Sequence, residues 1–175
     1  MDISLYDATI NNAMFLTKVD NIIAMLYSAI MKRDMNIVKH KISDNIYNEY
    51  LAKVNKSISN HEIQMYGEFN IKTSSIKNIS LDENFIIVDV DITLRYLDYI
   101  IDDETKKVKS GVTDRREEHN YTLTFIKRKD AKTLEPSRHC PTCGSVCDIS
   151  RTGECEYCKT IFNTLDYDYV LSKIN

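Results

Sequence analysis

The cysteines constrain the fold of this chain more than any other feature of its sequence. All five lie between positions 140 and 158 of 175 residues, and four form two C-x-x-C pairs, Cys140 with Cys143 and Cys155 with Cys158. Each C-x-x-C turn brings two thiolates to one ion, and zinc prefers four tetrahedral ligands. The two pairs therefore predict a zinc ribbon in the last third of the chain.

Four thiolates leave no position for water, so the predicted zinc is structural rather than catalytic. Iron fits the same sulfur set and is the main alternative metal, and a redox dithiol is the alternative to a metal site. Cys147 is left over, and we interpret it as a small buried residue of the ribbon, with replacement of a ligand as the alternative. His139, beside the first ligand, is interpreted as a connector residue.

The first third of the chain is predicted to be helical. Between positions 15 and 30 the apolar residues recur at steps of three and four, which places them on one face of an amphipathic helix. A comparable stripe runs from Met35 to Val54, with Ser43 and Asp44 as a candidate cap that breaks it.

The pattern then changes to the alternation of strands. Every even position over 86–96 is apolar, positions 121–126 alternate in the same way, and 62–79 forms a weaker strand region. The charged run 102–107, with its flanks 96–101 and 108–118, suits a hairpin. Helices followed by strands indicate an α+β fold with an antiparallel sheet.

The cysteine segment is predicted to be an insertion near the end of the sheet. Alternation resumes over 167–174, which favours a final strand that returns to the sheet. We therefore expect helices plus sheet over 1–135, the zinc ribbon over 136–162 and the final strand over 163–175.

Charge and composition bound the environment of the protein. The formal charge of −3 and the pI near 5.8 give no general attraction for phosphate backbones, so nucleic-acid binding ranks last. No apolar run approaches the roughly 20 residues of a membrane-spanning helix, and clustered C-x-x-C pairs are typical of a reducing compartment. We expect a cytoplasmic protein. The basic cluster Lys127, Arg128, Lys129 and Lys132 is interpreted as a solvated surface. The alternative is that this cluster makes peripheral contact with the inner face of the membrane.

The sequence assigns no catalytic residue. Asp89 and Asp91 share a strand face with Arg95 and could supply paired carboxylates for acid–base work, but we interpret them as part of a solvated strand face. His61 and His119 have no identifiable partner in the sequence. Phosphate-binding loops, nucleophile elbows and H-E-x-x-H helices are absent from the sequence.

Three runs near the C-terminus carry a family resemblance: Cys140-Pro141-x-Cys143-Gly144, Gly153-x-Cys155-Glu156-Tyr157-Cys158 and 169–174. They resemble bacterial members of the inner-membrane translocase subunit 44-like family, and the resemblance extends to 96–103 and 117–127. Tyr169 stands where relatives often have Trp, and Lys159 where a Gly of the second turn is common. The family implies a cone-shaped fold similar to nuclear transport factor two, with helices packed in a curved antiparallel sheet.

The resemblance also implies a non-enzymatic binding or tethering module, whose object is a protein partner, or a lipid or peptide in an apolar pocket. The alternative is a small-molecule-binding protein or an acid–base enzyme that uses the cavity of the cone, because such folds host chemistry elsewhere. A polar residue deep in the pocket would favour that alternative.

Overall fold

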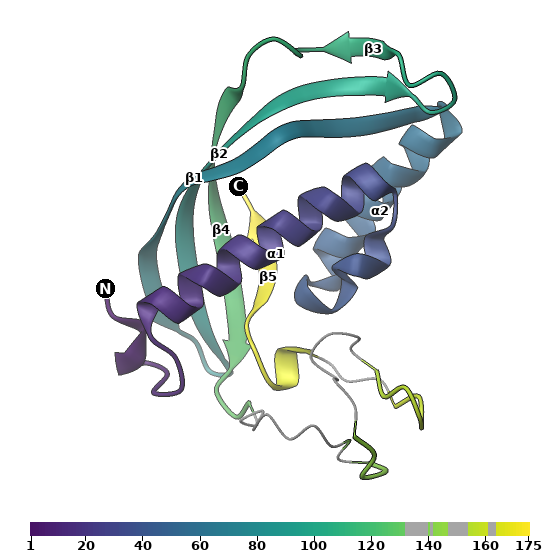
Figure 1. Ribbon diagram of the computed structural model, residues 1–175. Helices are drawn as coiled ribbons and strands as arrows, with labels where there is room; N and C mark the ends of the chain where they lie inside the picture. Colours follow the sequence, from purple (N-terminus) through teal and green to yellow (C-terminus); the bar gives the residue numbers. More distant parts are fainter. Residues whose placement is uncertain (132–139, 141, 147–153, 161–163) are drawn as a thin grey trace.

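In the computed structural model, two helices lie on the concave side of a curved antiparallel sheet (Figure 1). The structure describes residues 1–131, 140, 142–146, 154–160 and 164–175. Helix α1 is Asn12–Lys32 and α2 is Asp44–Ser59. The strands are β1 (Glu62–Leu81), β2 (Phe85–Asp102), β3 (Val108–Gly111), β4 (Glu117–Arg128) and β5 (Val170–Ile174). Short 3₁₀ turns occupy Ile3–Leu5, Met35–Ile37, Lys39–Lys41 and Thr164–Asp166. The α+β fold is confirmed.

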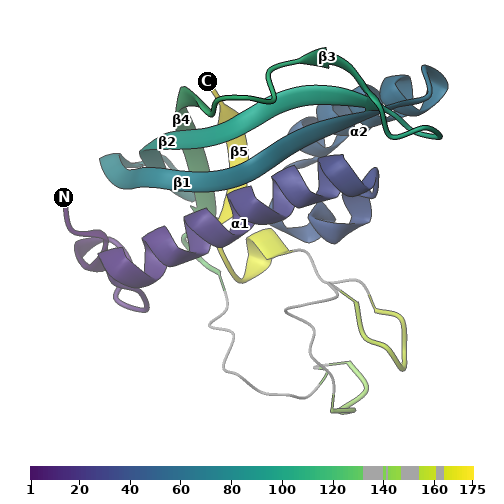
Figure 2. The same ribbon diagram turned by 45° about the horizontal axis from the view of Figure 1, so that its top comes forward.

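Helix α1 supplies the apolar stripe that the sequence predicts. Phe15, Val19, Ile22, Ile23, Leu26 and Ile30 are all buried, and the helix runs beside β1 (Figure 2). The Asn11 side chain accepts a hydrogen bond from the Met14 amide at 2.9 Å, which caps the first turn. Arg33 ends the helix in the left-handed region at φ 54°, a common way for helices to stop.

The expectation that no segment is long and apolar enough to cross a membrane is wrong for α1. By length and composition this helix meets that condition. It carries the buried stripe of the core, and a core helix of this kind passes the same test.

The second helical segment is shorter than predicted. Residues 35–42 form two 3₁₀ turns instead of an α-helix, and α2 begins at Asp44. Ser43 is the N-cap: its hydroxyl accepts from the Ile46 amide at 3.5 Å, while its own amide donates to the Leu171 carbonyl at 2.8 Å. The predicted break at Ser43 is confirmed, and it coincides with the point where the chain meets β5.

The described strands pair in the order β1-β2-β4-β5, with β3 beside β2, and every pairing is antiparallel. The even positions of β2 are buried from Ile86 to Tyr96, as the alternation predicts. The predicted hairpin is confirmed for β2 and β3, but β3 is brief and the chain rejoins the sheet as β4 at Glu117, opposite Tyr96. Gly111 makes this departure possible, because at φ +101° a Cβ would lie 2.3 Å from the Asp98 carbonyl oxygen.

Strand β5 pairs with β4, so the chain returns to the sheet after the cysteine segment. Tyr169, just before β5, is fully buried and packs edge-on against Phe15 at 5.0 Å between ring centroids. The boundaries at 136 and 162 stay a prediction, because 132–139 and 161–163 lie outside the described residues.

Candidate metal centre and cavity

The two cysteine pairs form turns with the same hydrogen-bond pattern. In the first turn, the Gly144 amide donates to the Cys140 carbonyl at 2.7 Å, and the Cys140 amide donates to the Ser145 carbonyl at 2.7 Å. Fifteen positions later, Lys159 and Thr160 make the equivalent bonds with Cys155, each at 2.9 Å. Gly144 and Lys159 both have positive φ, 74° and 59°. The second turn therefore has the same geometry as the first, although it has Lys in place of Gly.

These turns aim four thiols at one point. The sulfurs of Cys140 and Cys158 are 3.6 Å apart, those of Cys143 and Cys155 are 3.7 Å apart, and all four lie within 4.8 Å of one another. All four cysteines are free thiols. A tetrahedron with metal–sulfur bonds of about 2.3 Å has edges of about 3.8 Å. The four thiols can therefore hold one metal ion.

Hydroxyl and amide donors prepare two of the four sulfurs, those of Cys143 and Cys158, for a cation, whereas the pKa of Cys140 and that of Cys155 are raised. The Thr160 hydroxyl lies 3.1 Å from the Cys158 sulfur. This contact, together with a second hydrogen bond from the Thr160 amide, lowers the pKa of Cys158 to about 6. Ser145 lowers the pKa of Cys143 in the same way. Since metals bind the thiolate, these contacts favour the ligating form. Cys147 and His139, which the sequence analysis set aside from the ligands, lie outside the described residues.

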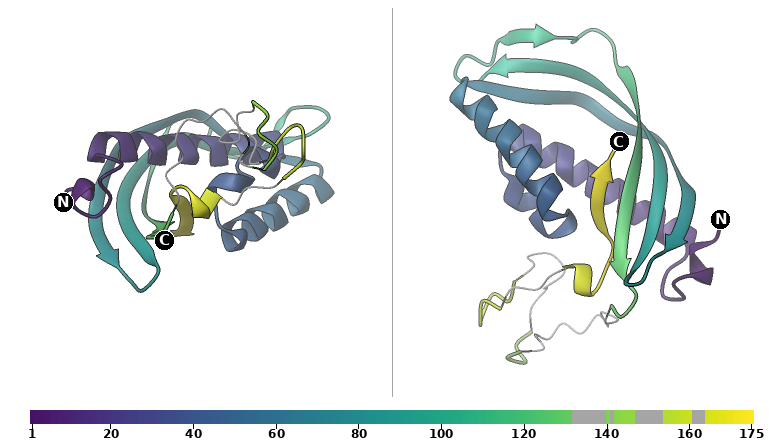
Figure 3. Two further views of the ribbon diagram at one scale, coloured as in Figure 1. Left: turned by 90° about the horizontal axis from the view of Figure 1, so that it is seen from below. Right: turned by 180° about the vertical axis from the view of Figure 1, so that it is seen from behind.

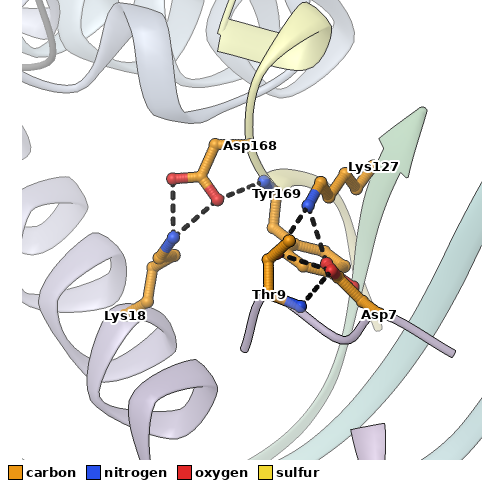
Figure 4. Close-up of polar contacts among 6 residues, drawn as sticks. All are labelled: Asp7, Thr9, Lys18, Lys127, Asp168 and Tyr169. Atoms are coloured by element: carbon orange, nitrogen blue, oxygen red, sulfur yellow. Dashed lines mark hydrogen bonds and ion pairs between the residues drawn. The ribbon is translucent and has the colours of Figure 1, made fainter. Parts of the chain in front are cut away.

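The stems of the cysteine segment are fixed to the N-terminal part of the chain (Figure 4). Lys127, near the end of β4, forms an ion pair with Asp7 at 2.7 Å, and the Tyr169 hydroxyl donates to the same Asp7 oxygen at 3.2 Å. On the neighbouring face, Lys18 of α1 pairs with Asp168 at 2.6 Å. Burial alone would raise the pKa of Asp7, but hydrogen bonds from Lys127 and Thr9 outweigh it and hold that pKa below its ordinary value.

The described part of the basic cluster is engaged within the chain. Lys127 is in the buried pair with Asp7, and Arg128 pairs with Asp130 at 2.9 Å. Lys129 donates to the carbonyl of Asp82. Lys132 lies outside the described residues. These contacts leave little support for a membrane surface built from this cluster.

The acidic strand face is likewise occupied by local partners. Asp91 accepts from the Thr122 hydroxyl at 2.6 Å and from Lys77 at 3.0 Å, and Asp89 accepts from Thr124 at 2.8 Å. Arg95 lies 3.3 Å from Glu118. The structure brings the two aspartates to one polar face of the sheet but into separate cross-strand contacts. His61 is largely exposed and lies 3.5 Å from Asp103.

A cavity of about 760 Å³ lies between α2 and the concave side of the sheet, whose curvature is clearest from behind (Figure 3). Its walls carry five tyrosines and a histidine: Tyr27, Tyr50, Tyr66, Tyr96, Tyr121 and His119. The sequence resemblance implies an apolar pocket, and this aromatic and hydroxyl-bearing lining was not predicted. The only signal was the abundance of tyrosine, 11 in the chain, because these side chains come from five separate elements.

His119 is the one isolated histidine of the sequence analysis that reaches this cavity. Its ring stacks on Tyr96 at 4.4 Å between centroids and 5° between planes. The Tyr96 and Tyr121 hydroxyls lie 3.3 Å apart beside it. The cavity thus presents aromatic faces together with polar atoms.

Comparison with known proteins supplies the family. The family model described as the Tim44-like domain matches residues 1–136. The chain belongs to the Tim44-like family. Its domain is similar to nuclear transport factor two in fold, and the curved sheet with helices on its concave side conforms to that cone. The Tim44-like domain is associated with non-enzymatic roles at proteins or membranes. No curated protein matches the chain.

Proposed function

We propose that this Tim44-like protein is a non-enzymatic binding or tethering module, which recruits a protein partner or associates with the membrane. The observation that carries the proposal is the family match over residues 1–136. The site geometry supports it, because the carboxylates of the sheet face are already engaged in cross-strand contacts. The cytoplasm, or the inner face of the membrane, is the proposed location.

We further propose that Cys140, Cys143, Cys155 and Cys158 bind a structural zinc ion. The sulfur separations of 3.6 and 3.7 Å support tetrahedral coordination by four thiolates, which would fill the coordination sphere of the metal. Such an ion would supply stability to the segment between β4 and β5 rather than chemistry. Iron fits the same sulfur set and is distinguished by metal analysis.

The tethering proposal is tested by capture of tagged protein from native lysate, with soluble and membrane fractions compared. We expect a reproducible protein partner, or enrichment in the membrane fraction. A matched Cys140→Ser/Cys155→Ser variant shows whether the metal segment contributes to capture. Recovery of a metabolite alone, without protein or membrane enrichment, would contradict tethering.

A second candidate is an acid–base enzyme that uses the cavity. The observation that favours it is the position of His119 in the cavity wall, beside the Tyr96 and Tyr121 hydroxyls. A captured metabolite that the protein converts on incubation, and that a His119→Gln variant leaves unchanged, would support this candidate over tethering.

A further inference from the structure

The cavity has the dimensions of a small-molecule site. Its volume of about 760 Å³ falls within the roughly 300–1,000 Å³ of typical ligand pockets. Helix α1, helix α2 and strands β1, β2, β4 and β5 all contribute to its walls. Aliphatic side chains also line the cavity: Ile30, Val54, Ile100 and Ile174.

The aromatic walls carry hydroxyl groups that stay uncharged near neutral pH. Burial raises the pKa of Tyr27, Tyr66 and Tyr96, and it raises that of Tyr50 to about 12. Tyr96 and Tyr121 place their oxygens 3.3 Å apart, so the cavity offers both donors and acceptors. An acyl chain in this space would remove these hydroxyls from water without replacing their hydrogen bonds, which is unfavourable.

Two of the carboxylates that line the cavity are neutralised by ion pairs. Glu49 pairs with Lys53 at 2.6 Å, and Lys53 also lies 4.4 Å from the Tyr50 ring centroid. Glu62 pairs with Lys109 at 3.1 Å. Asp98 accepts a hydrogen bond from the neutral amide of Gln64 at 2.7 Å. Among the described residues that line the cavity, Lys56 is the lysine outside the two ion pairs. Phosphate and carboxylate ligands need convergent cations, which this arrangement does not provide.

We propose that the cavity binds an uncharged small molecule that contains a planar ring with hydrogen-bonding substituents. Tyrosine rings supply faces and edges for ring packing, and their hydroxyls supply the polar contacts that orient such a ligand. This site goes beyond the tethering role and is independent of the metal.

The ligand class is tested with three matched probes: benzamide, octanamide and phenyl phosphate. Benzamide and octanamide share the amide group, and benzamide and phenyl phosphate share the ring. Titration of ¹⁵N-labelled full-length protein is followed by amide chemical shifts. We expect benzamide to shift cavity residues such as Tyr27, Tyr66 and His119, with affinity roughly tenfold above that of the other probes. Tighter binding of octanamide or phenyl phosphate, or no cavity shift with any probe, would overturn the proposal.

A Tyr96→Phe/Tyr121→Phe variant tests the hydroxyl contribution, because it keeps both rings. We expect roughly tenfold weaker benzamide binding and stronger octanamide binding. Tyr157→Phe, which removes an exposed hydroxyl far along the chain in the second cysteine turn, is the matched control and should change neither affinity. If the double variant fails to fold, Tyr121→Phe alone replaces it. Unchanged benzamide affinity in the folded variant would overturn the proposed ligand class. Capture of a protein partner by the wild-type protein tests the tethering function separately.

Discussion

Asp7 and Lys127, 120 positions apart in the sequence, form an ion pair of 2.7 Å whose side chains are only 5% and 13% exposed. The pair joins the N-terminal segment to the strand that leads into the cysteine segment (Figure 4). Tyr169, which follows that segment, donates to the same carboxylate. One carboxylate therefore fixes both stems of the predicted ribbon.

Asp7→Asn should destabilise the protein by roughly 3 kcal/mol, because it leaves the Lys127 charge buried without a counter-charge. Urea unfolding at pH 7 measures the change in the free energy of unfolding. The matched control is Glu49→Gln, in an ion pair with both side chains more than half exposed, where the expected loss is below about 0.5 kcal/mol. Equal losses in the two variants would contradict the buried character of the Asp7 pair.

The same pair predicts a specific acid dependence. Because the pKa of Asp7 in the folded protein lies below its ordinary value of 3.8, the carboxylate stabilises the fold above that value, and the contribution is lost as pH falls through the folded-state pKa. The difference in unfolding free energy between wild type and Asp7→Asn should be constant from neutral pH to about pH 5 and shrink below pH 3.8. Urea unfolding of both proteins across this pH range tests the prediction. A difference in unfolding free energy that grows in acid would contradict a lowered pKa for Asp7 in the folded protein.

Cys155→Ser should lower zinc affinity by more than about a hundredfold. Loss of a residue that only hydrogen-bonds to a metal ligand already lowers metal affinity by about 10- to 100-fold, and loss of the ligand itself should cost more. The sheet should stay folded, because the Asp7–Lys127 and Lys18–Asp168 contacts hold the stems without the metal. Metal content and the amide signals of Phe125 and Leu171 report the two effects. Cys147→Ser is the control and should retain the metal; release by both variants would make Cys147 a ligand.

Lys159→Gly should stabilise the second cysteine turn by roughly 1 kcal/mol, because only glycine adopts φ of 59° without steric cost. The ion pair it removes, with Glu154 at 3.7 Å, is solvent-exposed and contributes little. A higher chelator concentration for half-release of the metal would show the gain. Glu156→Gly in the same turn lacks this strain, and an equal gain there would refute the explanation.

The elements that the sequence predicts well are those with a regular period on one buried face. The stripe of α1 and the even positions of β2 are the clearest cases, and both are buried as expected. Strand β1 is harder to predict, because register shifts such as that between Gly67 and Asn70 interrupt its alternation. Residues 35–42 keep a helical spacing of apolar residues but form 3₁₀ turns where the chain joins β5 through Ser43.

The candidate sites show the same limit. The cysteine pairs could be found because their ligand spacing is local, at C-x-x-C, and the backbone hydrogen bonds of each turn join residues no more than five positions apart. The cavity could not be found from the sequence, because Tyr27 and Tyr121 line the same cavity only after a helix and a distant strand pack together. The Asp7–Lys127 pair depends on the same long-range packing.

The most direct test of the account is the metal content of untagged protein purified without added metal. We expect about one zinc per folded chain, held by four thiolates. Iron in place of zinc would contradict the identity of the metal, and fully folded protein with no metal and four reactive thiols would contradict the metal centre itself.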